Sequence, residues 1–73
     1  MIYRHLRYLR ETRKIKQTEL ASLLHVAQNT YSQYETGKIA LTADMLVLLA
    51  DFYQTSVDYL LDRTEDPTPY PKR

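Results

Sequence analysis

Helix-breaking residues are almost absent between residues 3 and 62. The single glycine is Gly37, and all three prolines follow residue 66. Apolar residues recur with the spacing of a helix face, as in Leu46, Leu49 and Tyr53, whereas alternating strand patterns are absent. The sequence therefore predicts an all-α chain. We expect five helices, at about 3–13, 17–24, 28–35, 42–53 and 56–62.

Two of these helices begin with a recognisable cap. Thr42 precedes an apolar run that has Asp44 in its first turn, and Ser56 precedes Val57 with Asp58 close behind. A hydroxyl at this position accepts a hydrogen bond from an unpaired backbone N–H, and an early carboxylate complements the helix dipole. We therefore expect Thr42 and Ser56 to be N-caps.

The chain is long enough for one small domain. Its 73 residues bury a modest core, and without any Cys neither a disulfide nor a thiolate metal site supports it. We expect a domain over 1–62 and a Pro-rich, flexible tail over 63–73. No apolar run is long enough for a signal peptide or a membrane span, so we expect a cytoplasmic protein without a membrane partner.

Charge is distributed unevenly, although the net charge is only +1. Counting Lys and Arg against Asp and Glu gives about +4 for residues 1–40 and about −3 for residues 41–73. A basic front half suits a surface presented to a polyanion such as nucleic acid. Chance clustering explains the same asymmetry equally well in so short a chain.

The helix expected at about 28–35 has an unusual polar face. At about 100° per residue, amides and hydroxyls fall on one arc, with Tyr31 and Tyr34 on the opposite side. A solvated helix face more often carries Lys and Glu, whereas Gln and Asn pair bidentately with adenine in the major groove. A DNA-reading face and a merely polar surface are both compatible with this arc. Its members are Gln28, Asn29, Ser32 and Gln33.

A longer, ordered set of residues resembles a known family. The set is Gln17-x-Glu19-Leu20-Ala21, Val26-x-Gln28, Tyr34-Glu35-x-Gly37, Leu46-x-x-Leu49-Ala50 and Ser56-x-Asp58-Tyr59-Leu60-Leu61. It is similar to the helix-turn-helix DNA-binding family of phage repressors and Cro proteins, the XRE-like transcriptional regulators. The resemblance implies a compact, five-helix, lambda-repressor-like domain whose helix-turn-helix comprises the second and third helices.

The resemblance also implies a role for individual residues, because the second helix of this motif places its N-terminal residues against base edges in the major groove. The implied base-contacting residues are Gln28, Asn29, Gln33, Thr30 and Ser32. The implied phosphate-contacting residues are Gln17, Lys38, Gly37, Thr36, Arg10, Lys14 and Lys16. For the last two lysines, simple solvation is an equally good explanation.

Arg10 lies on the apolar seam of the first helix, where a cation is costly without a partner. The resemblance places Glu35 beside it. We hypothesise an Arg10–Glu35 ion pair that joins the first helix to the third and holds Arg10 near the DNA backbone. The alternative is an Arg10 whose guanidinium reaches solvent.

Three positions within the helix-turn-helix itself depart from the family pattern. His25 stands where the family usually has the Gly of the inter-helix turn, a position that often needs a left-handed residue. Lys16 and Ala27 stand where the second and third helices would be capped, and Ala27 replaces the usual Ser or Thr. Each departure is expected to cost about 1 kcal/mol of stability while leaving the polar arc intact.

The tyrosines and the fourth helix indicate how the chain packs. We expect Tyr31, Tyr34 and Tyr53 to bury their rings and keep their hydroxyls at the rim of the core. The fourth helix is apolar nearly all round, which is typical of a central helix or of one covered by a partner. We expect a homodimer, with Tyr59, Leu60 and Leu61 at its interface.

No constellation of side chains indicates catalysis or metal binding. His5 and His25 are the only histidines, and without Cys a zinc site lacks ligands, so we expect them at the surface or in turns. Asp58 and Asp62, four residues apart, are typical of a solvated face. We therefore expect no enzyme, no metal or cofactor, and no small-molecule ligand.

The residues and the resemblance together favour a sequence-specific, double-stranded DNA-binding transcriptional regulator, most simply a repressor. Two alternatives stay open. One is an antitoxin-type autoregulator with a protein partner, and the other is a protein-interaction module that retains the fold.

Overall fold

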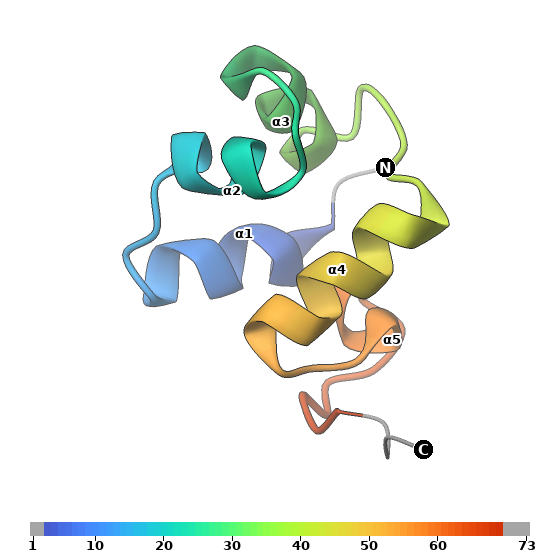
Figure 1. The fold of residues 1–73 in the computed structure, drawn as a ribbon. Coiled ribbons are helices and arrows are strands. Elements are labelled where there is room, and N and C mark those ends of the chain that lie inside the picture. Colours follow the sequence, from blue (N-terminus) through green and yellow to red (C-terminus); the bar gives the residue numbers. More distant parts are fainter. Residues whose placement is uncertain (1–2, 70–73) are drawn as a thin grey trace.

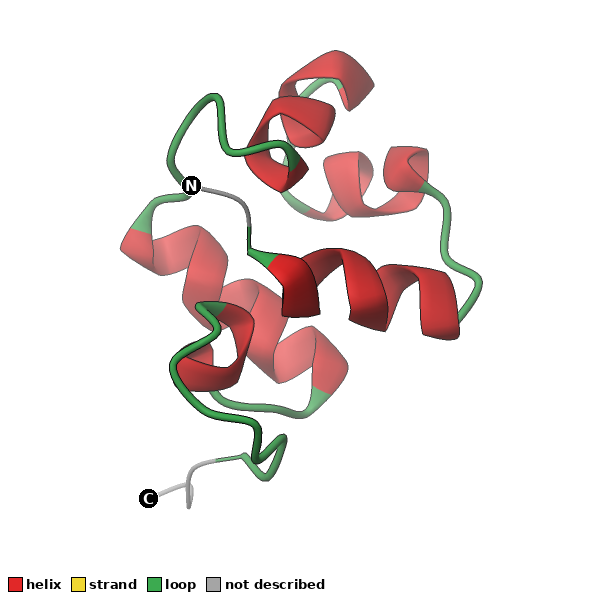
Figure 2. Ribbon diagram, turned by 180° about the vertical axis from the view of Figure 1, so that it is seen from behind, coloured by secondary structure: helices red, strands yellow, loops and turns green. Residues whose placement is uncertain are grey.

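The computed structural model describes residues 3–69 and contains five helices (Figure 1). No strand occurs in that part of the chain (Figure 2), so the prediction of an all-α fold is confirmed. Each predicted boundary lies within two residues of the observed one. The helices are α1 (Arg4–Thr12), α2 (Gln17–Leu23), α3 (Gln28–Glu35), α4 (Ala43–Tyr53) and α5 (Val57–Leu60).

Helix α1 lies between two helix pairs (Figure 1). The α2–α3 pair packs on one side of it and the α4–α5 pair on the other, with α1 in contact with both α3 and α5. The core between them is made of apolar and aromatic side chains. Its members are Leu6, Leu9, Leu20, Ala21, Leu24, Tyr31, Tyr34, Leu49, Ala50, Tyr53, Tyr59 and Leu60.

The three tyrosines predicted to enter the core do so. However, the hydroxyls of Tyr31 and Tyr53 are buried, and neither has a hydrogen-bond partner among residues 3–69. The expectation that these hydroxyls reach the rim is therefore wrong. Arg13 links α1 to α4 from the edge of the core, because its Nη2 donates to the Tyr53 carbonyl at 2.9 Å.

Both predicted N-caps are present. The Thr42 hydroxyl accepts a hydrogen bond from the Met45 N–H at 3.1 Å, and the Ser56 hydroxyl accepts one from the Tyr59 N–H at 3.0 Å. Lys16 and Ala27 precede α2 and α3 and supply no side-chain cap, as predicted. The two helices of the helix-turn-helix therefore begin without a side-chain hydrogen bond from the N-cap residue to their first backbone N–H groups.

Every helix in the described part of the chain ends in the same way. A residue with left-handed backbone follows it, with φ between 56° and 78°, and the N–H of the next residue bonds to a carbonyl five residues earlier at 2.9–3.0 Å. This is the Schellman arrangement, in which glycine avoids the steric cost of positive φ. Four of the five positions nevertheless carry a side chain. The left-handed residues are Lys14, His25, Gly37, Gln54 and Asp62.

The chain folds back after α5. The Asp62 carboxylate accepts hydrogen bonds from the backbone N–H groups of Arg4 at 2.7 Å and His5 at 3.0 Å, so it caps α1 across 58 positions of sequence. The Thr55 hydroxyl donates to the Pro67 carbonyl at 2.7 Å. The tail expected from residue 63 therefore contacts the domain as far as residue 67, and its last four residues, 70–73, lie outside the described residues.

Two expectations about side chains near this segment are wrong. His5 was expected at the surface but is only 8% exposed, because its ring packs against Tyr59. Asp62 is bonded to α1 rather than lying on a solvated face.

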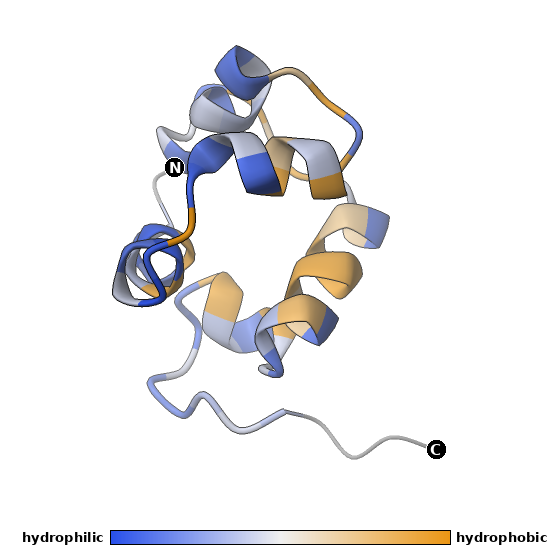
Figure 3. Ribbon diagram, turned by 60° about the vertical axis from the view of Figure 1, so that its left-hand side comes forward, coloured by the Kyte–Doolittle hydropathy of each residue, from blue (hydrophilic) through white to orange (hydrophobic). Residues whose placement is uncertain are grey.

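Helix α4 is the most apolar helix (Figure 3). Its inner face is buried, but Val47, Leu48 and Phe52 on its outer face are exposed. Tyr59 and Leu60, expected at a dimer interface, are instead 6% and 1% exposed within the chain's own core, which leaves them almost no surface for a second copy. None of the helices in residues 3–69 is long and apolar enough to cross a membrane.

Candidate nucleic-acid interface

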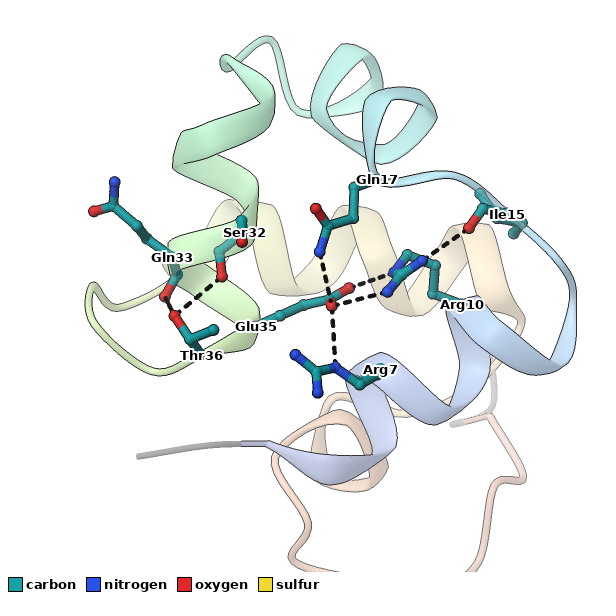
Figure 4. A network of polar contacts seen from close by, with 8 residues as sticks. All are labelled: Arg7, Arg10, Ile15, Gln17, Ser32, Gln33, Glu35 and Thr36. Atoms are coloured by element: carbon teal, nitrogen blue, oxygen red, sulfur yellow. Dashed lines mark hydrogen bonds and ion pairs between the residues drawn. The ribbon is translucent and has the colours of Figure 1, made fainter.

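Helix α3 turns its polar arc outward. Gln28 and Asn29 are exposed at its first turn, and Gln33 points away from the interior (Figure 4). Thr30, Ser32 and Gln33 are each half-buried. On the other side of the helix, Tyr31, Tyr34 and Glu35 are buried. The helix is therefore fixed to the core by one side and presents neutral hydrogen-bonding groups on the other.

The last residue of α3 is a buried carboxylate held by α1. Glu35 is 0% exposed, and Arg10 approaches it with two nitrogens, Nε at 2.6 Å from Oε2 and Nη2 at 3.2 Å from Oε1 (Figure 4). A third nitrogen of Arg10, Nη1, donates to the Ile15 carbonyl at 3.1 Å. The hypothesised ion pair is thus present, with the two-point geometry that makes Arg–carboxylate pairs strong.

Two further side chains converge on the same carboxylate. Gln17 Nε2 donates to Glu35 Oε1 at 3.2 Å from the start of α2, and Arg7 Nε lies 3.5 Å from that oxygen. Sequence reasoning missed Arg7, although it stands one turn before Arg10 on the same helix face. It assigned Gln17 to phosphate, and here the side-chain nitrogen of Gln17 is bonded within the domain.

The charges of this cluster are stabilised mutually. Burial alone would raise the pKa of Glu35, but the hydrogen bond and the charge of Arg10, together with the hydrogen bond from Gln17, hold that pKa below its usual range. The bond to Glu35 also raises the pKa of Arg10. Burial, followed by the nearby charge of Glu35, raises the pKa of Tyr31 far above its ordinary value. Two guanidinium groups therefore surround one carboxylate at neutral pH.

The turn after α3 carries the next group of expected phosphate contacts. Thr36 donates from its hydroxyl to the Ser32 carbonyl at 3.1 Å, and Gly37 has a φ of 78°. The N–H of Lys38 bonds to the Gln33 carbonyl at 2.9 Å, while the Lys38 side chain is exposed. Lys14 and Lys16 are exposed in the loop before α2.

Helices α2 and α3 pack against each other and are joined by a short turn at His25, whose φ of 58° fulfils the expected need for a left-handed residue. Helix α3 exposes its polar arc, and helix α2 packs against α3. This arrangement defines a helix-turn-helix protein.

The chain belongs to the helix-turn-helix family HTH_3, which matches residues 6–60. It is similar to YobD of Bacillus subtilis (strain 168), described as an uncharacterized HTH-type transcriptional regulator, at 38% identity over 73 residues. That match covers 100% of this chain and 65% of YobD. The HTH-type transcriptional regulator AnsR of the same organism is 37% identical over 67 residues, which cover 88% of this chain and 58% of AnsR.

The chain thus spans less than two thirds of the length of both relatives. A crystal structure of a transcriptional regulator from Listeria innocua matches 90% of this chain and 62% of that one, with a TM-score of 0.81 and 24% identity. The structural similarity shows a shared fold.

Proposed function

We propose that this chain is a sequence-specific transcriptional repressor that inserts α3 into the major groove of double-stranded DNA. The observation that carries the proposal is the division of α3 into a buried, ion-paired side and an exposed side of amides and hydroxyls. Such groups match the donor and acceptor pattern of base edges. The names of YobD and AnsR as transcriptional regulators support it.

In this proposal the first turn of α3 supplies the main base contacts. Gln28 and Asn29 are its most exposed side chains, and Thr30, Ser32 and Gln33 follow along the same arc. Phosphates would be bound on either side by exposed cations and by backbone groups near helix ends. We assign this role to the exposed side chains of Lys38, Thr36, Lys14 and Lys16, to the turn at Gly37 and to the backbone of Gln17. The expected phosphate contact of Arg10 is not kept, because its side chain is only 15% exposed and its guanidinium bonds to Glu35 and to the Ile15 carbonyl.

We further propose that the repressor is a homodimer. A two-fold dimer presents two copies of α3 to half-sites about 34–36 Å apart. Support comes from Val47, Leu48 and Phe52, which form an exposed apolar face on α4 that nothing in the described chain covers. Of the three residues that the sequence placed at the dimer interface, Leu61 is half-buried and keeps some exposed surface, whereas Tyr59 and Leu60 are buried.

Selection of bound duplexes from a random pool tests DNA binding, half-site symmetry and spacing together. With the selected site, Gln28→Ala is expected to cost about 1–3 kcal/mol and to relax preference at one base step. Gln54→Asn changes an exposed amide after the end of α4, away from the polar arc of α3, and is the matched control that should bind as the native chain does.

Two results would contradict the proposal. Equal weakening of Gln28→Ala on every sequence would mean that Gln28 reads no base. A salt dependence near zero on random duplex would mean that no phosphates are neutralised. The second result would favour a protein-interaction module, for which the exposed apolar face of α4 would be the relevant surface.

A further inference from the structure

Arg7 is the cation through which the buried carboxylate of Glu35 is linked to the surface. Its side chain is 50% exposed, whereas that of Arg10 is 15% exposed and that of Glu35 is fully buried. Arg10 already bonds to both oxygens of Glu35 and to the Ile15 carbonyl, so each of its nitrogens has an acceptor inside the domain. Of the two guanidinium groups at Glu35, only that of Arg7 can be reached by a partner from outside.

The guanidinium of Arg7 keeps most of its donors for such a partner. Only Nε approaches Glu35, at 3.5 Å from Oε1, which is longer than the range of about 2.7–3.2 Å typical of N–H···O bonds. The terminal nitrogens, Nη1 and Nη2, point away from the carboxylate (Figure 4), and within residues 3–69 neither is bonded to an acceptor. Together they carry all but one of the guanidinium N–H groups, in the flat arrangement that binds a phosphate with two parallel hydrogen bonds.

The charge of Arg7 is not balanced within the described chain. Two guanidinium groups face one carboxylate, and Arg10 is the nearer of the two, at 2.6 Å against 3.5 Å for Arg7. Glu11 stands one turn further along α1, but it forms no ion pair with Arg7 among the residues that the structure describes. The excess positive charge therefore lies at the exposed Arg7, where it can attract an anion.

Arg7 lies beside the end of the helix that carries the polar arc. Glu35 is the last residue of α3, so a side chain that contacts its carboxylate approaches this helix end from α1. The turn that follows α3 carries the exposed side chains of Thr36 and Lys38, to which we have assigned phosphate contacts. An arginine at this place can therefore extend the phosphate-binding surface from the turn onto α1.

We propose that Arg7 is a further DNA-contacting residue, which binds a backbone phosphate through Nη1 and Nη2 while Nε stays against Glu35. The inference rests on the proposed function and deepens it. The contact replaces the one that the family resemblance implied for Arg10. Because Arg7 then joins a phosphate to the last residue of α3, it fixes the position of the DNA backbone relative to that helix, which is how phosphate contacts set the register of base reading.

The salt dependence of DNA binding by the full chain tests this contact. Arg7→Gln removes one exposed charge, so the slope of log affinity against log salt should become less steep by about 0.9. A rise from about 50 to about 200 mM salt should then weaken the variant about 3.5-fold less than it weakens the native chain. The change should be equal on the selected site and on a shuffled duplex, because a phosphate contact carries no sequence information.

Two further variants separate this contact from other effects of the substitution. Arg4→Gln removes the same charge from the same helix, at a side chain that lines a hollow with Tyr59 and Glu65, and it should keep the native slope. Arg7→Lys keeps the charge but loses the flat fork, so it should keep the native slope while binding more weakly at every salt concentration. Urea unfolding establishes that each variant is folded under the conditions of the binding assay.

Three results would overturn the inference. A native slope in Arg7→Gln would mean that Arg7 only holds Glu35. An equal loss of slope in Arg4→Gln would mean that net charge alone matters, and a slope in Arg7→Lys as low as in Arg7→Gln would mean that the effect is not one of charge. A native chain whose binding does not depend on salt would refute the proposed function, whereas salt-dependent native binding with an unchanged slope in Arg7→Gln would refute this contact alone.

Discussion

Replacing His25 by glycine should stabilise the protein. His25 occupies the left-handed position that ends α2, with a φ of 58°, and its side chain is exposed. Its N–H bonds to the Ser22 carbonyl at 3.2 Å, and the following N–H bonds to the Ala21 carbonyl at 2.9 Å. His25→Gly keeps both backbone bonds and removes the Cβ that makes this conformation costly.

The expected gain follows from two opposing terms. Left-handed backbone costs a residue with a side chain about 1–2 kcal/mol, and His tolerates it better than most residues, so the lower value applies. Glycine at the same time lowers the free energy of unfolding by about 0.4–1 kcal/mol, because it makes the unfolded chain more flexible. The net gain is therefore at most about 0.6 kcal/mol and about 0.3 kcal/mol at the midpoint, which raises the Tm of a domain this size by about 1–2 °C.

Thermal and urea unfolding followed by circular dichroism measure this gain. His25→Ala is the matched control, because it removes the same imidazole but keeps the Cβ and should not stabilise the protein. If the glycine variant were less stable than the native chain, or equal to the alanine variant, relief of left-handed strain at His25 would be the wrong explanation.

Three further perturbations test the buried side of the site and the helix ends. Glu35→Gln should cost about 3–5 kcal/mol in urea unfolding, because it leaves Arg10 partly buried without its counter-charge. The pKa of Glu35 is held below its usual range in the folded state. The contribution of the ionised Glu35 to the free energy of unfolding is therefore complete above the pKa of the unfolded chain, about 4.3, and is lost as the pH falls through the lower pKa of the folded chain. Acid unfolding of Glu35→Gln should lack that component. Ala27→Ser should raise the free energy of unfolding by about 1 kcal/mol, because a serine hydroxyl can cap α3. An unchanged Tm would contradict the conclusion that α3 gains stability from a cap at this position. Burial, then the charge of Glu35, raises the pKa of Tyr53 to about 12, so in an absorbance titration its ionisation should appear only near that pH. The contribution of the neutral Tyr53 to the free energy of unfolding should be complete below the pKa of the unfolded chain, about 10, and be lost as the pH rises toward the higher pKa of Tyr53 in the folded chain.

The features that sequence reasoning predicted correctly depend mainly on neighbours along the chain. Helix boundaries follow from the spacing of apolar residues, and the caps at Thr42 and Ser56 follow from a hydroxyl placed before such a run. The left-handed turn at His25 was expected because the family usually has glycine there. The Arg10–Glu35 pair was found only through a resemblance that supplied the partner.

The features that were missed join residues far apart in sequence. Asp62 stands four residues after Asp58, and nothing in that local spacing separates a solvated carboxylate from one that caps α1. His5 has no periodic signal that it stacks on Tyr59. Arg7 did carry a signal, since it shares a helix face with Arg10, but the convergence of two arginines and Gln17 on one carboxylate needs the packing of three helices.

The cap that Asp62 provides has a consequence for biosynthesis. The first helix of the domain is completed by a residue that is translated 58 positions later. At about 5–20 residues per second, the nascent chain waits about 3–12 s between making the start of α1 and making its cap. Helix α1 therefore emerges from the ribosome without a partner for its leading N–H groups. It reaches its native state only when the chain as far as Asp62 is free to fold, which makes closure of the two ends of the domain a late step in its production.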